Sequence, residues 1–334
     1  GFGTTSTKFR RPLSVATDGR RLAVCDALNN RVMIFNNIPI SNGVAADVVV
    51  GQDDFVTGNS GLAANRLSNP RGAAWLGDRF FISDSGNHRI LVFNKTPVAN
   101  GASADLVIGQ PNFSLRNTVD SETGAISSRT LNSPQTPMVS FNGKLIIGDT
   151  NNNRVLIFNS IPTQNYARAD VVIGQPGFTT GTADYDGVSA RSLAGPEGIV
   201  YFGKELFIAN GNIGRGRVMI FKELPKQNFA AADYVLGQPD LNNCQIWPPA
   251  KGTFSNSEGL AGNGTHLFVP DETNNRVLIF NLSDQSAVKL GPQFDQGKAV
   301  LGKVFLDFNE NGVQDGPQST VHGPQNSSTV DRGL

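Results

Sequence analysis

The sequence predicts an all-β protein in which one four-stranded unit repeats five times, and three observations carry this prediction. A block of the form Arg-apolar-apolar-apolar-Phe recurs along the chain. A second apolar block, ending in Gly-Gln, follows each of its first four copies after a short loop. Glycine and proline supply 37 and 18 of the 334 residues, which is high for a helical protein and low for a disordered or collagen-like one.

The two blocks define the repeat unit. The first occurs five times, at spacings of 58, 65, 63 and 59 residues, over 31–35, 89–93, 154–158, 217–221 and 276–280. The second occupies 46–52, 104–110, 169–175 and 232–238, with a weaker fifth copy at 298–303. Two further apolar segments precede each Arg block, as at 71–75 and 79–83. Each unit therefore holds four short strands separated by Gly, Asn and Asp turns.

The apolar residues in these strands occupy consecutive rather than alternate positions. A strand of this kind has both faces buried. Four-stranded sheets that are covered on both faces and repeated around a ring are the blades of a β-propeller. We therefore expect a five-bladed propeller over residues 1–302. A six-bladed ring is the alternative, and it would need a sixth sheet from the chain ends or from a partner.

The composition excludes several classes of function. Lys plus Arg equals Asp plus Glu, at 28 each, so the chain lacks the excess positive charge of a nonspecific nucleic-acid binder. Three His and two Cys are too few for zinc clusters, c-type haem sites or a disulfide scaffold. No apolar run approaches the roughly 20 residues of a membrane helix. Cys25 and Cys244 leave two interpretations open, which are free thiols and a disulfide between neighbouring first and fifth units.

Repeated polar residues predict structural turns. In four units an Asp lies five residues before the Arg, and a short-range ion pair of this kind would hold the hairpin turn. The pairs are Asp26 with Arg31, Asp84 with Arg89, Asp149 with Arg154, and Asp271 with Arg276. The fourth unit differs, because its turn is two residues longer and has Asn210 in place of Asp. This departure makes Asn210 and Arg215 candidate binding residues.

The connections between units differ in length and sequence, as recognition loops do on a rigid scaffold. We expect binding at residues 53–69, 111–133, 176–195 and 239–256. The last loop contains Trp247 next to two prolines. This side chain either offers a rigid apolar contact to a partner or fills the centre of the ring.

The repeat resembles a known family. The run Asn69-Pro-Arg-Gly-Ala-Ala-Trp75, followed by a Gly turn, an apolar strand ending in Ser-Asp and then Asn-His-Arg-Ile, is similar to an NHL repeat. The resemblance covers all five units, about residues 10–302, and implies a propeller, most often with six blades. Related six-bladed enzymes use acidic or His residues that converge on the channel, and the sequence alone singles out no such set here.

The last residues, 303–334, are a different kind of sequence. Asp307, Asn309, Asn311, Val313 and Asp315 match positions 1, 3, 5, 7 and 9 of an EF-hand-type calcium loop. Gln318 stands where such a loop has a bidentate Glu, which leaves either a calcium site of lowered affinity or an empty loop. The run also resembles the start of a B-type repeat of bacterial serine-aspartate surface proteins. That resemblance implies an extracellular or cell-surface location, with the tail as a linker, a donated strand or the start of a further module.

Three functions remain open from the sequence. The first is a noncatalytic extracellular propeller that binds a protein or glycan through its variable loops. The second is a structural subunit of a cell-surface assembly or filament, homomeric or heteromeric. The third is a metal-dependent hydrolase or lyase that acts in the channel. The pattern favours the first, with no catalytic residue assigned, no nucleic-acid partner and calcium as the sole candidate cofactor.

Overall fold

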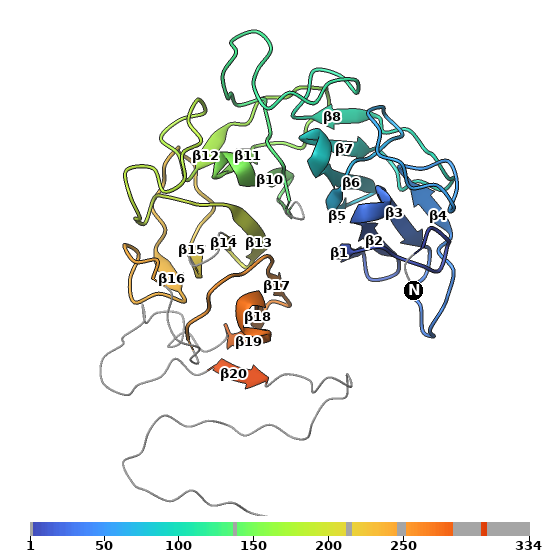
Figure 1. Ribbon diagram of the computed structural model, residues 1–334. Coiled ribbons are helices and arrows are strands. Elements are labelled where there is room, and N and C mark those ends of the chain that lie inside the picture. The colour runs from blue at the N-terminus through green and yellow to red at the C-terminus, as the bar shows by residue number, and fades with distance from the viewer. Residues whose placement is uncertain (1–2, 136–138, 212–215, 246–251, 283–301, 306–334) are drawn as a thin grey trace, which may run out of the picture.

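The computed structural model describes residues 3–135, 139–211, 216–245, 252–282 and 302–305. Its regular structure consists of five four-stranded antiparallel sheets and four single-turn 3-10 helices. The sheets follow one another around an arc (Figure 1). The predicted all-β propeller of five sheets is confirmed.

Each sheet is formed by four strands that are consecutive in the chain. Sheet 1 contains β1 (Pro12–Thr17), β2 (Leu22–Asp26), β3 (Arg31–Phe35) and β4 (Val48–Val50). Sheet 2 contains β5 (Pro70–Leu76), β6 (Arg79–Asp84), β7 (Arg89–Phe93) and β8 (Leu106–Ile108). Sheet 3 contains β9 (Val139–Phe141), β10 (Lys144–Asp149), β11 (Arg154–Phe158) and β12 (Val171–Ile173).

The last two sheets have the same order. Sheet 4 contains β13 (Pro196–Phe202), β14 (Glu205–Asn210), β15 (Arg217–Phe221) and β16 (Tyr234–Leu236). Sheet 5 contains β17 (Ala261–Gly262), β18 (His266–Asp271), β19 (Arg276–Asn281) and β20 (Gly302–Phe305). The first strand of each sheet contacts the first strand of the next, so β1, β5, β9, β13 and β17 form the inner side of the arc.

The core lies between consecutive sheets. Val32 and Ile34 of β3 pack with Phe80 and Ile82 of β6 in one buried cluster. The next residue of β6, Phe81, points the other way and packs in the cluster shared with sheet 3. Because neighbouring residues of a strand face opposite sides, a sheet that lies between two others needs apolar residues at every position. This arrangement explains the consecutive apolar residues of the repeat.

The turn between the second and third strands depends on a left-handed residue. Asn30, His88, Asn153 and Asn275 close the four 3-10 turns with φ between 51° and 54°. Asn tolerates this conformation better than most residues, and His is also enriched there. The side chain at this position then binds the next unit, as where Asn69 N–H donates to Asn30 Oδ1 at 2.9 Å.

Two sequence expectations are resolved by the fold. The fourth strand of sheet 5 is Gly302–Phe305, so the sheet extends beyond the boundary expected after residue 302. Val304 and Phe305 are strong strand formers, and they pair with Leu278 and Val277 of β19. Cys25 and Cys244 are free thiols, and burial raises the pKa of Cys25 to about 12.

Candidate functional site

Each unit has an arginine at the start of its third strand, which is fully buried in the first four units and nearly so in the fifth. Arg31, Arg89 and Arg154 are fully buried, and each Nε donates to the Asp that ends the second strand, at 2.7–2.8 Å. Sheet 5 has the same pair, Asp271 with Arg276, at 2.8 Å. The second carboxylate oxygen accepts a backbone N–H just before the first strand, donated by Arg10, Ser68, Asn132 and Ser255 respectively. The Asp–Arg pairs predicted from the repeat thus lie at the hairpin turns.

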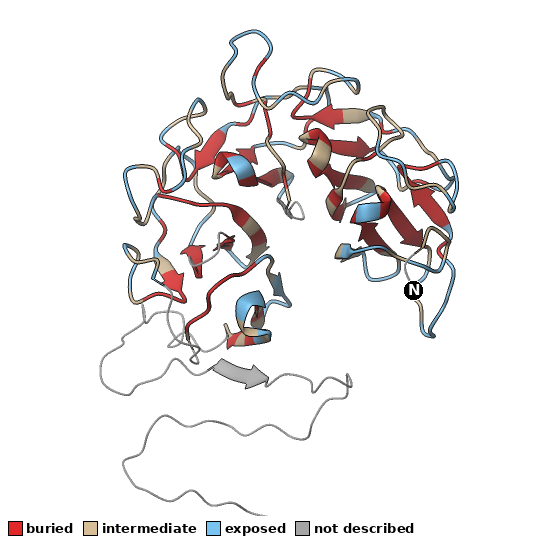
Figure 2. Cartoon of the chain, in the orientation of Figure 1, coloured by how far each residue is buried: buried red, intermediate tan, exposed pale blue. Residues whose placement is uncertain are grey.

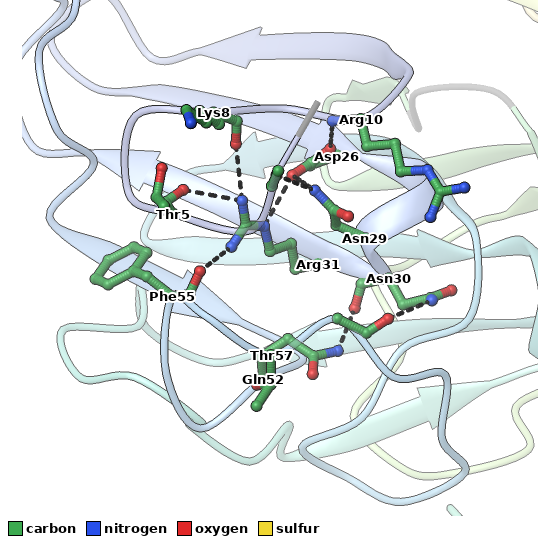
Figure 3. Close-up of polar contacts among 12 residues, drawn as sticks. Thr5, Lys8, Arg10, Asp26, Asn29, Asn30, Arg31, Gln52, Phe55 and Thr57 are labelled. Atoms are coloured by element: carbon green, nitrogen blue, oxygen red, sulfur yellow. Dashed lines mark hydrogen bonds and ion pairs between the residues drawn. The ribbon is translucent and has the colours of Figure 1, made fainter. Parts of the chain in front are cut away.

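In sheets 1 to 3 the guanidinium also binds the segments that enter and leave the sheet, and Arg276 Nη2 donates to the carbonyl of Thr253 in the loop that enters sheet 5. Arg89 donates through Nη1 to the carbonyl of Phe113 at 2.6 Å, and through Nη2 to those of Ala63 and Arg66. Phe113 lies in the loop that leaves sheet 2, and Ala63 and Arg66 lie in the loop that enters it. Figure 3 shows the same arrangement around Arg31, with the carbonyls of Phe55, Thr5 and Lys8. A forked group with five donors suits this purpose, and we call each arrangement a clamp.

A buried glutamine supports each of the first four clamps. Gln110 Nε2 donates to the carbonyl of the turn residue His88 at 3.0 Å and to the carbonyl of Asn117 at 2.8 Å. Gln52, Gln175 and Gln238 make the equivalent pairs of bonds. The repeated Gly-Gln therefore holds the start of the connecting loop against the turn.

These contacts gather the variable loops at one end of the strands. In an antiparallel sheet, the turn from the second to the third strand lies at the same end as the start of the first strand and the end of the fourth. The clamps join these segments directly. We define the clamp face as the hairpin turns together with the four connecting loops 53–69, 111–133, 176–195 and 239–256, the last taken over its described residues 239–245 and 252–256. The loop between β8 and β9 projects furthest from the arc in Figure 1.

The fourth unit keeps its clamp with a carboxylate from a different place. Asn210 occupies the Asp position and accepts the N–H of Ala194 at 3.2 Å. Arg217 instead pairs with Asp184 of the preceding loop at 3.2 Å and donates to the carbonyl of Ser192 at 2.9 Å. Asn210 is fully buried, and its role in binding a partner stays a prediction.

The other sequence-predicted site residues lie outside the described residues. They are Arg215, Trp247 and the proposed calcium ligands Asp307, Asn309, Asn311, Val313 and Asp315.

A second group of polar residues lies on the inner strands, and the sequence argument did not single it out. Glu197 of β13 and Arg71 of β5 follow the proline that begins each strand. Glu258 takes the same position just before β17, and Glu272 lies in the turn of sheet 5. Arg71 Nη1 also donates to Gln135 Oε1, the residue at this position before β9. We call Arg71, Gln135, Glu197, Glu258 and Glu272 the inner cluster.

Charge and burial act together in the inner cluster. Desolvation raises the pKa of Glu197 to about 7, and Glu258 and Glu272 add to the rise while Arg71 opposes it. Desolvation also raises the pKa of Glu258, and Glu272 adds to this both by its charge and by a hydrogen bond. A carboxyl that titrates near neutral pH can hold or release a proton there.

A signal for the inner cluster was present in the repeat. The proline recurs in four units, whereas the residue after it differs and is Leu13, Arg71, Gln135 or Glu197. A position that is polar in three of these units and differs in each, next to a repeated proline, could have marked the inner cluster. Only the ring brings these positions together.

Three other features of the described residues bear on function. A surface pocket of about 650 Å³ lies at the end of the strands opposite the clamp face, between sheets 3 and 4, and is lined by Lys144, Tyr201, Lys204, Glu223 and Lys226 among others. Within the described ranges, no three His, Cys, Asp or Glu residues are grouped so that they could hold a metal ion. The same ranges contain no helix of the length and apolarity needed to cross a membrane.

The repeated clamps and four-stranded sheets define this chain as a β-propeller protein. No protein-family model matches it, and neither does any curated protein. Among solved structures, it is similar to a crystal structure of a nidogen/laminin complex, at 15% identity and a TM-score of 0.44, covering 82% of this chain and 77% of that one. It is also similar to a putative 6-phosphogluconolactonase from Bacteroides uniformis, at 17% identity and a TM-score of 0.48, covering 81% and 66%.

Proposed function

We propose that this protein is a noncatalytic binding propeller that recognises a protein or glycan through its clamp face. The observation that carries the proposal is that buried Arg and Gln side chains hold loops of very different sequence in fixed positions. The four loops contain 17, 23, 20 and 18 residues. Loops that are ordered before binding lose less conformational entropy when a partner docks.

The proposal includes an extracellular or cell-surface location. Its support is the similarity of residues 303–334 to the start of a B-type repeat of bacterial surface proteins. In this setting the tail connects the propeller to a further module, and its Asp307–Asp315 loop binds calcium.

The binding role is tested by replacing loop tips. Residues 121–124 are exposed at the tip of the longest loop, and a Gly-Ser replacement there leaves the clamp residues intact. We expect the full chain to bind a member of an immobilised panel of glycans and surface proteins, and a replaced loop to weaken that binding at least tenfold. Val98→Asp is the matched control, because Val98 is exposed in the connection between β7 and β8 at the opposite end of the strands. Absence of binding, or binding that survives replacement of all four loops, contradicts the proposal.

The calcium site is tested separately on the full chain. Native mass spectrometry should show one calcium ion that a chelator removes, and Asp307→Asn with Asp315→Asn should abolish it. A chain that carries no calcium at millimolar concentration contradicts this part of the proposal and leaves the clamp face unaffected.

One observation favours a second function, which is acid–base catalysis at the inner cluster. Glu197, with its pKa near 7, can act as an acid or a base beside Arg71. A panel of ester, lactone and glycoside substrates tests this idea. Activity that Glu197→Gln reduces at least 100-fold, while Glu122→Gln on an exposed loop does not change it, would favour catalysis over the binding role.

A further inference from the structure

The surface pocket between sheets 3 and 4 has a volume of about 650 Å³, which is in the range of pockets that hold small molecules. Its walls are Lys144 at the start of β10, Asn159 after β11, Tyr201 of β13, Lys204 in the turn that follows, and residues 223–226 after β15. The strands of these sheets are mostly buried, whereas the connections at their ends are largely half-buried or exposed (Figure 2). The pocket is therefore open to solvent, and we call it the lysine pocket.

In the first two junctions between sheets, an arginine crosses from one sheet to the next. It lies five residues before the Asp that ends the second strand. Arg21, just before β2, donates through Nη1 to the hydroxyl of Thr96 in the connection after β7, and its guanidinium carbon lies 5.2 Å from the ring centre of Trp75 in β5. Arg79 of β6 donates to the carbonyl of Pro162, in the connection after β11, at 3.2 Å. Each guanidinium thus bridges two sheets.

Sheet 3 has a shorter cation at the same position. Lys144 lies five residues before Asp149, and its Nζ donates to Oδ1 of Asn159 in the same sheet. The residues beside this pair, Leu145 and Phe158, are partners in the register of β10 and β11. A lysine bound to its own sheet does not fill the space that an arginine bridges in the first two junctions. The lysine pocket lies at the junction where this arginine is replaced.

The charges around the pocket favour an anion. Lys144, Lys204 and Lys226 contribute three positive charges and Glu223 one negative charge, which leaves a net charge of +2 among the lining residues. Lys204 and Lys226 are exposed and Lys144 is half-buried. Each ammonium group carries three hydrogen-bond donors. Because the three lysines come from three different segments, their positive potential is concentrated at the cavity.

The remaining wall is apolar and includes an aromatic ring. Tyr201, Leu224 and Pro225 are each half-buried, so part of their surface is accessible. Tyr201 takes the position in β13 that Trp75 has in β5. Desolvation raises the pKa of Tyr201, and the charge of Glu223 adds to the rise, so the hydroxyl stays protonated at neutral pH. A ring with a polar end suits a ligand that has both an apolar face and hydroxyl groups.

We propose that the lysine pocket binds an acidic saccharide, which is a sugar that carries a carboxylate or a sulfate group. The anionic group lies among the three ammonium groups, and the C–H face of the sugar ring lies against Tyr201 and Pro225. Lysine acts as a point charge without the planar fork of arginine, so both kinds of anion fit. A sugar is favoured over an acidic peptide, because it presents an apolar face and hydroxyl groups beside its charge. The inference goes beyond the proposed function, because the pocket and the clamp face lie at opposite ends of the strands.

Calorimetry on the full chain tests the proposal, with a galacturonate disaccharide and a sulfated galactose disaccharide as separate probes. We expect at least one probe to bind with a dissociation constant below about 1 mM, and the neutral galactose disaccharide to bind about tenfold more weakly. Inorganic sulfate alone should also bind more weakly, because it makes no contact with the apolar wall. The Gly-Ser replacement of residues 121–124 should leave this binding unchanged, so that the lysine pocket and the clamp face are tested independently.

Three variants locate the bound saccharide. Lys204→Gln combined with Lys226→Gln removes two exposed ammonium groups and should weaken binding about tenfold. Lys144→Arg keeps the charge but introduces the longer side chain that bridges the first two junctions, so it should fill the pocket and weaken binding by a similar factor. Lys95→Gln is the matched control, because Lys95 is exposed in the corresponding connection of sheet 2, and its binding should equal that of the wild type.

Several results would overturn the proposal. One is the absence of binding of both acidic probes at about 10 mM, and another is binding that the double lysine variant leaves unchanged. Equal affinity for the neutral disaccharide would exclude a role for the charges. Equal affinity for inorganic sulfate would reduce the pocket to a simple anion site, and tighter binding of a short polyglutamate peptide would assign it to acidic protein segments. Both lysines of the double variant are exposed, so its test does not depend on a change in the core.

Discussion

The buried Asp–Arg pairs show how a single residue organises a large part of this molecule. A buried ion pair contributes little net stability compared with well-packed apolar residues, but removing one partner leaves an uncompensated charge. Here the arginine also binds loop carbonyls that would otherwise lack partners in the interior. Its repeated use therefore specifies the loop positions more than it adds to stability. The fourth unit supports this view, since a different carboxylate, Asp184, has taken over the same function.

The substitution Asp184→Asn tests this exchange of carboxylates. It removes the countercharge of fully buried Arg217, so we expect the free energy of unfolding to fall by about 3 kcal/mol. Asn210→Asp in the same background restores a carboxylate at the position used in the other units, and it should recover most of the loss. Chemical denaturation measures both effects, and Asp186→Asn, at an exposed neighbour, is the control. Unchanged stability of Asp184→Asn would show that Arg217 does not depend on Asp184.

Glu197 predicts how stability changes with pH. Its pKa is about 7 in the folded protein against 4.5 for an ordinary Glu, so the folded state holds this proton more tightly than the unfolded state. Its contribution is complete below pH 4.5 and is lost as the pH rises towards 7. After allowance for partial solvent exposure, this loss is on the order of 1–2 kcal/mol. Glu197→Gln should remove this part of the decline, as measured by denaturation between pH 4 and 8. An identical pH profile for the variant and wild type would contradict the prediction.

At the scale of strands and loops, the main finding is that neighbouring sheets are joined in two different ways. Apolar side chains fill the space between them, and this part follows from the consecutive apolar residues of each strand. An Asn side chain adds a directional contact at the outer strand, because Asn100 Oδ1 accepts the N–H of Val49 and Asn165 Oδ1 accepts that of Val107. We call this contact the Asn latch. The latch fixes the position of one sheet along the next, because it pairs a single residue with a single residue.

Two matched substitutions measure the value of the latch. Asn100→Ala breaks an occupied latch and should lower the free energy of unfolding by about 1 kcal/mol, with faster hydrogen exchange at Val49. Asn42 holds the equivalent position in sheet 1 and has no hydrogen bond to another described residue, so Asn42→Ala should leave the stability unchanged. Equal destabilisation by both variants would mean that Asn42 has an intramolecular partner.

For the whole molecule, the open arc predicts unequal stability among the sheets. In a repeat protein, each unit is stabilised by its contacts with its neighbours. Among the described residues, sheets 2, 3 and 4 pack on two neighbouring sheets, and sheets 1 and 5 pack on one. Hydrogen exchange should therefore be slowest in β6, β7, β10 and β11 and faster in β18 and β19. Uniform protection across all five sheets would indicate that the ring is closed in solution.

The sequence was sufficient for the repeat, the number of sheets and the Asp–Arg pairs, because all three depend on residues close together in the chain. Strand periodicity reports which faces are buried, and a five-residue spacing is enough to join Asp26 to Arg31. The sequence also marked the loops of the clamp face, since their boundaries follow from the repeated blocks.

Contacts between distant residues required the folded molecule. Asp184 and Arg217 are 33 residues apart, and the inner cluster draws residues from the units of sheets 2, 3, 4 and 5. The exposure of Val277 could not be predicted from its own strand, because its sequence has the same apolar pattern as the buried strands of the other sheets. Local sequence determines which residues form strands and turns. Whether an apolar face is covered depends on the presence of a neighbouring sheet, and this is a property of the arrangement in space.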